Sequence, residues 1–176
     1  MREKKDIRLF FALWPDEALR PRLHAAAKTI PLARAARRVP SANLHMTLHF
    51  IGNVYFDEMA CMQSEARKVE AEGFSFELDC QGFFARPRVG WLGCSEAPAA
   101  LGELHRQLGE RLQGCGYRPE SRPYHPHVTV MRKTTTVPEA ASFDPISWTV
   151  SDFALIEVRT VANGVEYRVV ESYPLT

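Results

Sequence analysis

The sequence predicts an α+β fold in which mainly antiparallel strands surround a central cleft and the helices pack outside. Three observations support this fold class. Short apolar segments end at proline or glycine, as strands do; one segment carries leucines at helical spacing; and the order strand, helix, histidine-bearing strand occurs twice. We therefore expect one domain over residues 1–176, built of two pseudo-symmetric lobes related by approximate duplication.

The chain begins with an apolar strand, "IRLFFALW", over residues 7–14. A helix is expected next, over residues 16–30, with Asp16 placed to cap its start. Pro21 lies inside this segment, and proline is tolerated only in the first turn of a helix. The helix therefore either begins near Leu19 or has an irregular first turn.

The remaining elements follow from the periods of apolar residues, which are two in strands and three to four in helices. Further strands are expected over residues 44–52, 74–85, 88–95, 127–132, 147–160 and 164–173. Further helices are expected over residues 57–72 and 97–116, the second with a stripe formed by Leu101, Leu104, Leu108 and Leu112. Residues 134–145 are expected to form a loop.

Charge and hydropathy exclude several classes of protein. The 22 basic and 21 acidic residues leave a net charge of +1, so an anionic ligand must be held by a local basic patch. No segment approaches the ~20 apolar residues of a membrane span. The apolar run near the start is too short for a signal peptide. We expect a cytoplasmic protein with no membrane partner.

The four cysteines, Cys61, Cys80, Cys94 and Cys115, lie at least 14 residues apart and form no C-x-x-C motif. This spacing argues against a zinc ribbon or a thioredoxin-like redox site. A chain of 176 residues also buries enough surface to need no disulfide. We expect all four cysteines to be small buried side chains in a reducing compartment.

Two tetrads share one pattern, namely a histidine, any residue, a threonine and an aliphatic residue. They are "HMTL" at residues 45–48 and "HVTV" at residues 127–130. Successive side chains of a strand point to opposite faces. The side chains expected to face the core are Met46, Leu48, Phe50, Val128 and Val130. The side chains expected on the opposite face are His45, Thr47, His49, His127 and Thr129.

Two histidines that face one cleft can form an acid–base pair, because a pKa near 6.5 lets one be neutral and the other protonated at working pH. Such a pair suits phosphoester chemistry in which water is deprotonated on one side and a leaving oxygen is protonated on the other. The threonine hydroxyls can donate to the phosphoryl oxygens. From the residues alone, two ordinary strand histidines beside threonines of high β-propensity remain an alternative.

The text around both tetrads resembles the 2H phosphoesterase superfamily, and within it the bacterial 2′-5′ RNA ligase family of RNA 2′,3′-cyclic phosphodiesterases. The resemblance covers nearly the whole chain, in "RLFFAL", "RVPSANLHMTLHFIGNV", "RPRVGWLG" and "SRPYHPHVTVMR". It implies the two-lobed duplicated fold of that superfamily. It also implies a hydrolase that opens 2′,3′-cyclic phosphates on RNA ends or nucleosides and leaves a 2′-phosphate, with no cofactor and no metal.

The resemblance also implies a role for each motif residue. His127 would be the general base that activates water, and His45 the general acid that protonates the leaving 3′ oxygen. Thr47 and Thr129 would anchor the phosphate, and Arg132 would add positive charge to this anchor. The same pair can also run 2′-5′ ligation, which joins a 5′-hydroxyl end to the cyclic phosphate.

Each of the other residues near the motifs can have one of two roles. Arg38 is the best placed of the basic connector residues to steer RNA phosphates, or it belongs to a solvated connector. Phe10, Phe11 and Tyr124 can stack on a base or pack in the core, and only one of the two phenylalanines can face the cleft. His125 is expected to be non-catalytic, as is His49.

Two rival functions stay open at this point. A metallohydrolase would use His45, His49, His125 and His127 as a zinc set, although neither motif strand holds an acidic residue. A non-catalytic module would bind RNA ends without turnover. Within the enzyme class, the substrate can also be another cyclic phosphate or a 2′-5′ oligonucleotide. Monomer is the default oligomeric state.

Overall fold

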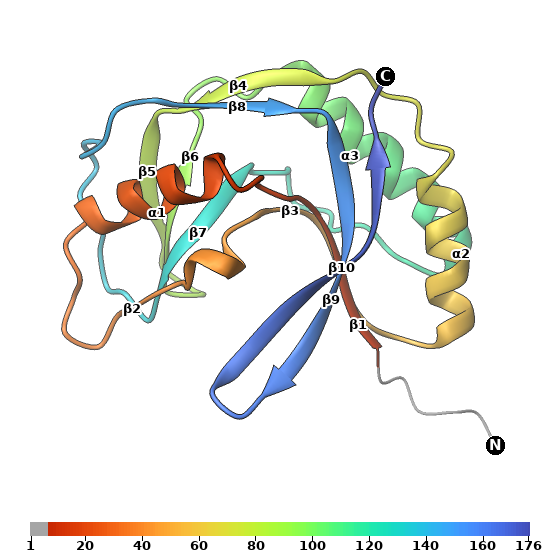
Figure 1. Cartoon of the computed structure of the whole chain (residues 1–176), viewed down its shortest axis with the longest axis horizontal. Helices are drawn as coiled ribbons and strands as arrows, with labels where there is room; N and C mark the ends of the chain where they lie inside the picture. Colours follow the sequence, from red (N-terminus) through yellow and green to blue (C-terminus); the bar gives the residue numbers. More distant parts are fainter. Residues whose placement is uncertain (1–6) are drawn as a thin grey trace.

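One curved antiparallel sheet organises the protein in the computed structural model, which describes residues 7–176 (Figure 1). Its strands are, in sheet order, β10 (Gly164–Pro174), β9 (Asp152–Val161), β1 (Ile7–Leu13), β3 (Met46–Val54), β7 (His127–Arg132), β6 (Val89–Gly93) and β5 (Cys80–Phe84). The short β2 (Arg37–Arg38) pairs with β7. A separate two-stranded sheet joins β4 (Phe74–Leu78) to β8 (Ile146–Val150).

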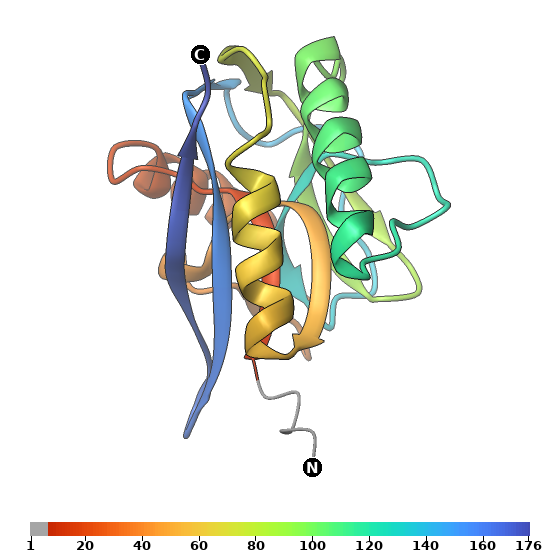
Figure 2. The same ribbon diagram turned by 90° about the vertical axis from the view of Figure 1, so that its right-hand side faces the viewer.

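Three α-helices lie outside the sheet, as expected for the α+β class (Figures 1 and 2). They are α1 (Leu19–Thr29), α2 (Phe56–Ala66) and α3 (Ala99–Leu112), with the single turns η1 (Ser41–Asn43) and η2 (Gln113–Cys115). Helices α2 and α3 lie side by side at one end of the molecule (Figure 2). Within residues 7–176, no helix is both long and apolar enough to cross a membrane.

Helix α1 begins at Leu19, which is one of the two expected starts. The Asp16 carboxylate accepts a hydrogen bond from the Leu19 backbone N–H at 2.7 Å. Pro21 lies in the first turn, where a backbone N–H would have no partner inside the helix. The stripe expected on α3 is also confirmed, because its four leucines are fully buried.

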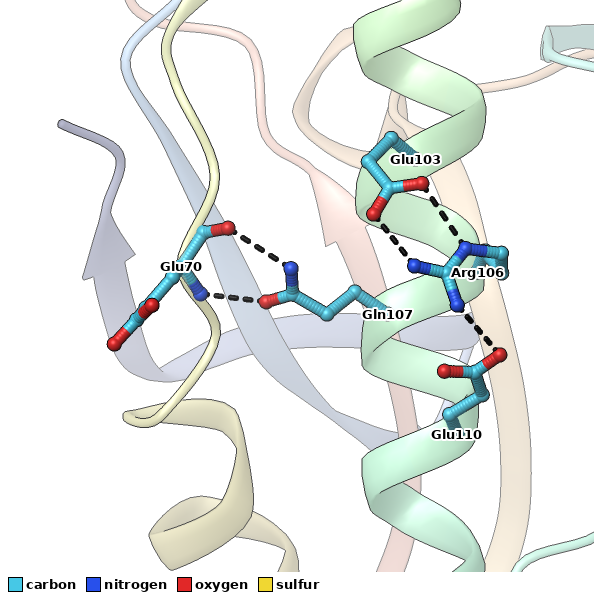
Figure 3. A network of polar contacts seen from close by, with 5 residues as sticks. All are labelled: Glu70, Glu103, Arg106, Gln107 and Glu110. Atoms are coloured by element: carbon cyan, nitrogen blue, oxygen red, sulfur yellow. Dashed lines mark hydrogen bonds and ion pairs between the residues drawn. The ribbon is translucent and has the colours of Figure 1, made fainter.

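Helix α2 is shorter than expected, because it ends at Ala66 rather than near residue 72. Hydrogen bonds from α3 hold the segment that follows α2. The side-chain amide of Gln107 on α3 accepts from the backbone N–H of Glu70 and donates to the Glu70 carbonyl (Figure 3). These two bonds satisfy backbone groups that a longer helix would have paired internally.

Two segments expected as single strands are each divided between the two sheets. Residues 74–85 form β4 and β5, with the break at Asp79, whose carboxylate accepts bonds from Ser95. Residues 147–160 form β8 and the start of β9, with the break at Ser151. The assignment of each half to a strand was correct, but the sequence carries no sign of a change of sheet.

Strand β3 breaks the alternation expected around Phe50. Opposite β1, Phe11 pairs with His49 and Ala12 pairs with Thr47, so Leu48 is the extra residue of a bulge. Leu48 and His49 are therefore both buried, whereas the Phe50 side chain is 50% exposed. The expectation that Phe50 faces the core was wrong.

The expectation that all four cysteines are free was also wrong, because Cys61 and Cys115 form a disulfide. Cys61 lies on α2, and Cys115 lies in η2 at the end of α3, so the bond joins two helical segments 54 residues apart in sequence. Cys80 and Cys94 are free and only partly buried. Packing of α2 against α3 creates this pairing, and sequence spacing does not reveal it.

Candidate active site

The two His-x-Thr motifs meet at the centre of the sheet. Strands β3 and β7 are antiparallel neighbours, and Met46 pairs with Val128. Met46 and Val128 are both fully buried, as expected for the core side of each strand. Antiparallel pairing places the residues that flank this pair across from one another, His45 with Thr129 and Thr47 with His127. The two motifs therefore form one site with approximate two-fold symmetry.

Both motif histidines are anchored in the same way. The Nδ1 atom of His45 donates to the Asn43 carbonyl at 2.7 Å, and the Nδ1 atom of His127 donates to the His125 carbonyl at 2.7 Å. A carbonyl can only accept, so each ring carries its proton on Nδ1 when neutral. The Nε2 atoms are thereby set as the reactive nitrogens.

His45 is also linked to the threonine of its own motif. Its Nε2 atom lies 3.0 Å from the Thr47 hydroxyl, which donates to it when the ring is neutral. Arg20 on α1 holds the turn before His45 by donating to the carbonyls of Ser41, Leu44 and Pro15. The backbone that carries the first histidine is therefore fixed from outside the sheet.

Burial keeps both imidazoles neutral at pH 7. It lowers the pKa of His45 to about 4; the Asn43 carbonyl opposes this shift, and the charges of Arg132, His127 and Arg20 add to it. Burial also lowers the pKa of His127, again against the pull of a backbone carbonyl. A neutral imidazole is ready to act as a base, whereas an acid must first acquire a proton.

A cavity of about 650 Å³ opens beside these groups. It is lined by Thr47, His127, Thr129 and Arg132, four of the five residues assigned to acid–base chemistry and phosphate binding from the sequence. His45 itself does not line this cavity, but its Nε2 atom bonds to Thr47, which does. Such a cavity can hold a drug-sized ligand or a nucleotide.

Arg38 does not join these residues. Its guanidinium donates to the carbonyls of Ala27 and Ile30, at the C-terminal end of α1. The exposed Arg37, by contrast, pairs directly with Arg132 across β2 and β7, so the two side chains leave the same face of the sheet. The structure thus offers Arg37 as the neighbour of the phosphate anchor.

The choice between Phe10 and Phe11 is resolved by their contacts. Phe11 is fully buried and packs with Phe153 and Tyr173, whereas the Phe10 ring stacks on His45 at 4.6 Å. The bulge in β3 does not disturb this alternation along β1. Phe10 therefore lies on the face that carries the site.

Tyr124 lies in the cavity wall, but much of its side chain is engaged. Its hydroxyl donates to the Thr47 carbonyl at 2.9 Å, and its ring stacks on His105 at 3.9 Å with an angle of 9° between the planes. His105 in turn stacks on His49. Tyr124 thus supports the backbone of the first motif at Thr47.

His49 has both ring nitrogens in hydrogen bonds. Its Nε2 atom donates to the His105 carbonyl at 2.7 Å, so its Nδ1 atom accepts from the Tyr117 hydroxyl at 3.1 Å. This geometry separates His49 from the four-histidine zinc set considered above. Within the described residues, no group of three or more His, Cys, Asp and Glu side chains is arranged to hold a metal ion.

No sequence motif predicts that several other residues belong to the site. Trp14 and Tyr167 surround His45, and Phe84 lies edge-on to His127. His105 belongs to the cavity wall although its segment was expected to be an ordinary helix. Each comes from an element distant in sequence from the motif it contacts, so only the fold brings them together.

Comparison with known proteins gives one consistent family. Residues 15–162 match the model of the 2'-5' RNA ligase superfamily. The Escherichia coli K12 protein named RNA 2',3'-cyclic phosphodiesterase is 32% identical over 174 residues, 96% of this chain and 97% of that protein. A Methanothermobacter thermautotrophicus protein of the same name is 35% identical, over 72% of this chain and 71% of its own length.

A solved structure agrees with these relatives. The crystal structure of E. coli LigT complexed with 3'-AMP superposes with a TM-score of 0.84 and 31% identity, and the match covers 97% of this chain and 98% of that one. The resemblance inferred from the two motifs and their surroundings is therefore confirmed. The chain belongs to the 2'-5' RNA ligase superfamily.

Proposed function

We infer that this protein is an RNA 2′,3′-cyclic 3′-phosphodiesterase, a hydrolase that opens the cyclic phosphate at an RNA end or on a nucleoside and leaves a 2′-phosphate. The observation that carries this function is the paired site in which each motif supplies one imidazole and one hydroxyl around Met46 and Val128. Relatives that cover nearly the whole chain bear the name of this activity.

In the proposed mechanism His127 is the general base. Its Nε2 atom takes a proton from water as the water oxygen bonds to phosphorus. The bond from phosphorus to the 3′ oxygen breaks, and His45 gives its Nε2 proton to that oxygen. Each transfer of this kind contributes ~10²–10⁴-fold to the rate. The products are a 2′-phosphate and a free 3′-hydroxyl, and the two histidines exchange protonation states.

The phosphate would be held by three further groups. The hydroxyls of Thr47 and Thr129 donate to the two non-bridging oxygens, where negative charge gathers in the transition state. Arg132, on the same strand as Thr129, adds positive charge. The proposal is supported by the cavity, which all three residues line.

The same site would also run 2′-5′ ligation. A 5′-hydroxyl takes the place of water and attacks the cyclic phosphate, while the histidines keep the roles that they have in hydrolysis. Microscopic reversibility requires that the pair exchange these roles when the 2′-5′ bond is cleaved again. Hydrolysis and ligation then compete, according to which hydroxyl occupies the space beside His127.

The test is hydrolysis of a nucleoside 2′,3′-cyclic phosphate, and of a short RNA ending in one, with excess EDTA present. We expect a 2′-phosphate from the unsubstituted chain, and a loss of ~10²–10⁴-fold in kcat for His45→Ala and for His127→Ala. His24→Ala, on the distant helix α1, is the matched control. Full activity in either motif variant would remove that histidine from the mechanism.

Other outcomes of this assay point to the rival functions. A 3′-phosphate product would keep the histidine pair but reverse the assigned leaving oxygen. Turnover that appears only when a divalent metal is added would support a metallohydrolase. Binding of the RNA end without turnover under either condition would support a binding module.

We further propose that the enzyme acts as a monomer in the cytoplasm, where its RNA substrates are made. The Cys61–Cys115 disulfide is uncommon for that compartment. Rapid alkylation of thiols in intact cells, followed by mass spectrometry of the purified chain, measures whether both cysteines are bonded there. Light scattering at micromolar concentration measures the oligomeric state.

A further inference from the structure

Three aromatic rings surround His45. Phe10 stacks on the imidazole at 4.6 Å with an angle of 30° between the planes, and Trp14 stacks on it at 6.0 Å and 22°. Tyr167 meets it edge-on at 5.3 Å and 86°. Phe10 and Trp14 come from β1 and the residues that follow it, and Tyr167 comes from β10. The β9–β10 hairpin thus completes a group of rings that β1 begins.

The surroundings of His127 are different. Phe84 is perpendicular to its ring at 5.0 Å and 89°, and Trp91 is tilted at 6.4 Å and 59°. Neither ring is stacked on this imidazole, although its Nδ1 anchor matches that of His45. The two motifs are alike in sequence and hydrogen bonding, so the aromatic groups are what distinguish the two histidines.

An imidazolium is attracted to the face of an aromatic ring, because the ring quadrupole is negative there. The charged groups around His45 provide little help to its protonated form. Arg132 on β7, His127 on β7 and Arg20 on α1 all disfavour a positive charge on it, and only the Asn43 carbonyl favours one. Stacked rings therefore supply an attraction that the surrounding charges do not.

We propose that the faces of Phe10 and Trp14, which stack on the imidazole, form an aromatic cage that stabilises the protonated form of His45 and so makes it, rather than His127, the general acid. The inference rests on the proposed two-histidine mechanism and explains how a nearly symmetric site acquires two distinct roles. The rings act through His45, so they are positioning residues. Phosphate bound beside the ring supplies the negative charge, and the cage supplies the cation-binding faces.

Trp14 gives the best test, because its ring is stacked on His45 and its side chain is only partly buried. Trp14→Leu removes the ring and keeps an apolar side chain, whereas Trp14→Phe keeps an aromatic face. The pKa of His45 is measured by NMR of the imidazole in the presence of saturating inorganic phosphate. We expect Trp14→Leu to lower this pKa by about 0.5 or more and Trp14→Phe to lower it by less.

Kinetics give a second, independent measure. Because His45 must be protonated to act, the basic limb of the kcat profile should move to lower pH in Trp14→Leu, with KM changed by less than a few fold. Phe84→Leu, beside the other histidine, should leave the titration of His45 in place. A buried Phe10→Leu substitution serves as a confirmatory variant once its fold is verified by circular dichroism.

Two results would overturn the cage. An unchanged pKa of His45 in Trp14→Leu would mean that the ring only packs, and a raised pKa would mean that it acts mainly by excluding water. The NMR titration needs no turnover, so it tests the cage even if the proposed activity fails. Failure of the activity itself would appear as absence of hydrolysis by the unsubstituted chain.

Discussion

The lowered pKa values of His45 and His127 set a condition on catalysis. Burial makes both rings neutral at pH 7, yet the proposed mechanism needs one of them to be protonated in the complex. The phosphate charge must therefore raise the pKa of a motif histidine when the ligand binds, since an opposite charge within a few ångströms favours the charged form. Ligand binding and proton uptake are then linked.

We expect the binding of a nucleoside 2′-phosphate, the proposed product, at pH 7 to take up close to one proton. Protons are taken up rather than released, because the motif histidine is neutral in the free protein and protonated in the complex. Calorimetry in two buffers with different ionisation enthalpies measures the number directly. His45→Gln should reduce this uptake, and binding without any uptake in the unsubstituted chain would show that the site stays neutral.

At the scale of residues, the sequence predicts what is local. The two tetrads reveal their own histidines and threonines, because alternation along a strand fixes which side chains share a face. Trp14 is brought to His45 by the pairing of β1 with β3, and Tyr167 by the pairing of β1 with β9 and of β9 with β10. Arg38 was preferred over Arg37 on distance along the chain, whereas strand register places Arg37 beside Arg132.

At the scale of elements, α3 makes two kinds of polar contact, of which only one reaches the connection that follows α2 (Figure 3). Arg106 bridges Glu103 and Glu110 on the exposed surface of the helix, and Gln107 binds both backbone groups of Glu70. Exposed ion pairs contribute little to stability because water and salt screen them. The two bonds from Gln107 instead replace water at the backbone N–H and carbonyl of Glu70, which would otherwise need to be hydrated.

We therefore expect Gln107→Ala to destabilise the protein more than Arg106→Ala does. The loss of two hydrogen bonds should cost about 1–2 kcal/mol, and the loss of the exposed ion pairs less than ~1 kcal/mol. Urea unfolding of both variants gives the comparison. An equal or larger loss for Arg106→Ala would mean that the ion pairs within α3 contribute at least as much to stability as the two bonds from Gln107 to Glu70.

The Cys61–Cys115 disulfide joins α2 to the end of α3, and it closes a loop with a sequence separation of 54 residues. Closing a loop of that length restricts the unfolded chain by up to about 4 kcal/mol. We expect the double variant Cys61→Ser, Cys115→Ser to lose about 2–4 kcal/mol in its free energy of unfolding.

The double variant Cys80→Ser, Cys94→Ser is the matched control, since both of its cysteines are free and partly buried. It should lose less than the first variant. Equal stability of the unsubstituted chain with and without a reducing agent would contradict a stabilising role for the bond. Residue spacing alone could not predict this pairing, because it depends on the packing of two helices.

At the scale of the whole molecule, one sheet runs through both halves of the chain, and the active site lies where they meet. The joint between β3 and β7 is a single residue pair, Met46 with Val128, and both side chains are fully buried. We propose that the two halves form one cooperative unit, since neither motif can be assembled without this joint. The repeated order of elements favours two lobes, but it does not reveal the change of sheet at Asp79 and Ser151, which depends on tertiary structure.

Four buried or half-buried histidines then link the stability of this unit to pH. Burial is the largest cause of the lowered pKa of His45, His49, His105 and His127, with values of about 4 for His45 and His105. The unfolded chain binds a proton at each of them near pH 6.5. Between about pH 6.5 and pH 4 the unfolded state therefore binds more protons, and stability falls as the pH falls.

We expect a single unfolding transition whose free energy is constant above pH 7 and decreases on acidification through this window. The slope reaches at most about 1.4 kcal/mol per pH unit for each fully buried histidine, and less for the half-exposed His105. Urea unfolding at pH 7.5, 6, 5 and 4.5 measures this slope. His45→Gln should reduce it by the contribution of close to one bound proton. A free energy that does not change between pH 7.5 and pH 4.5 would mean that these imidazoles are hydrated, and the neutral, anchored site described here would not hold.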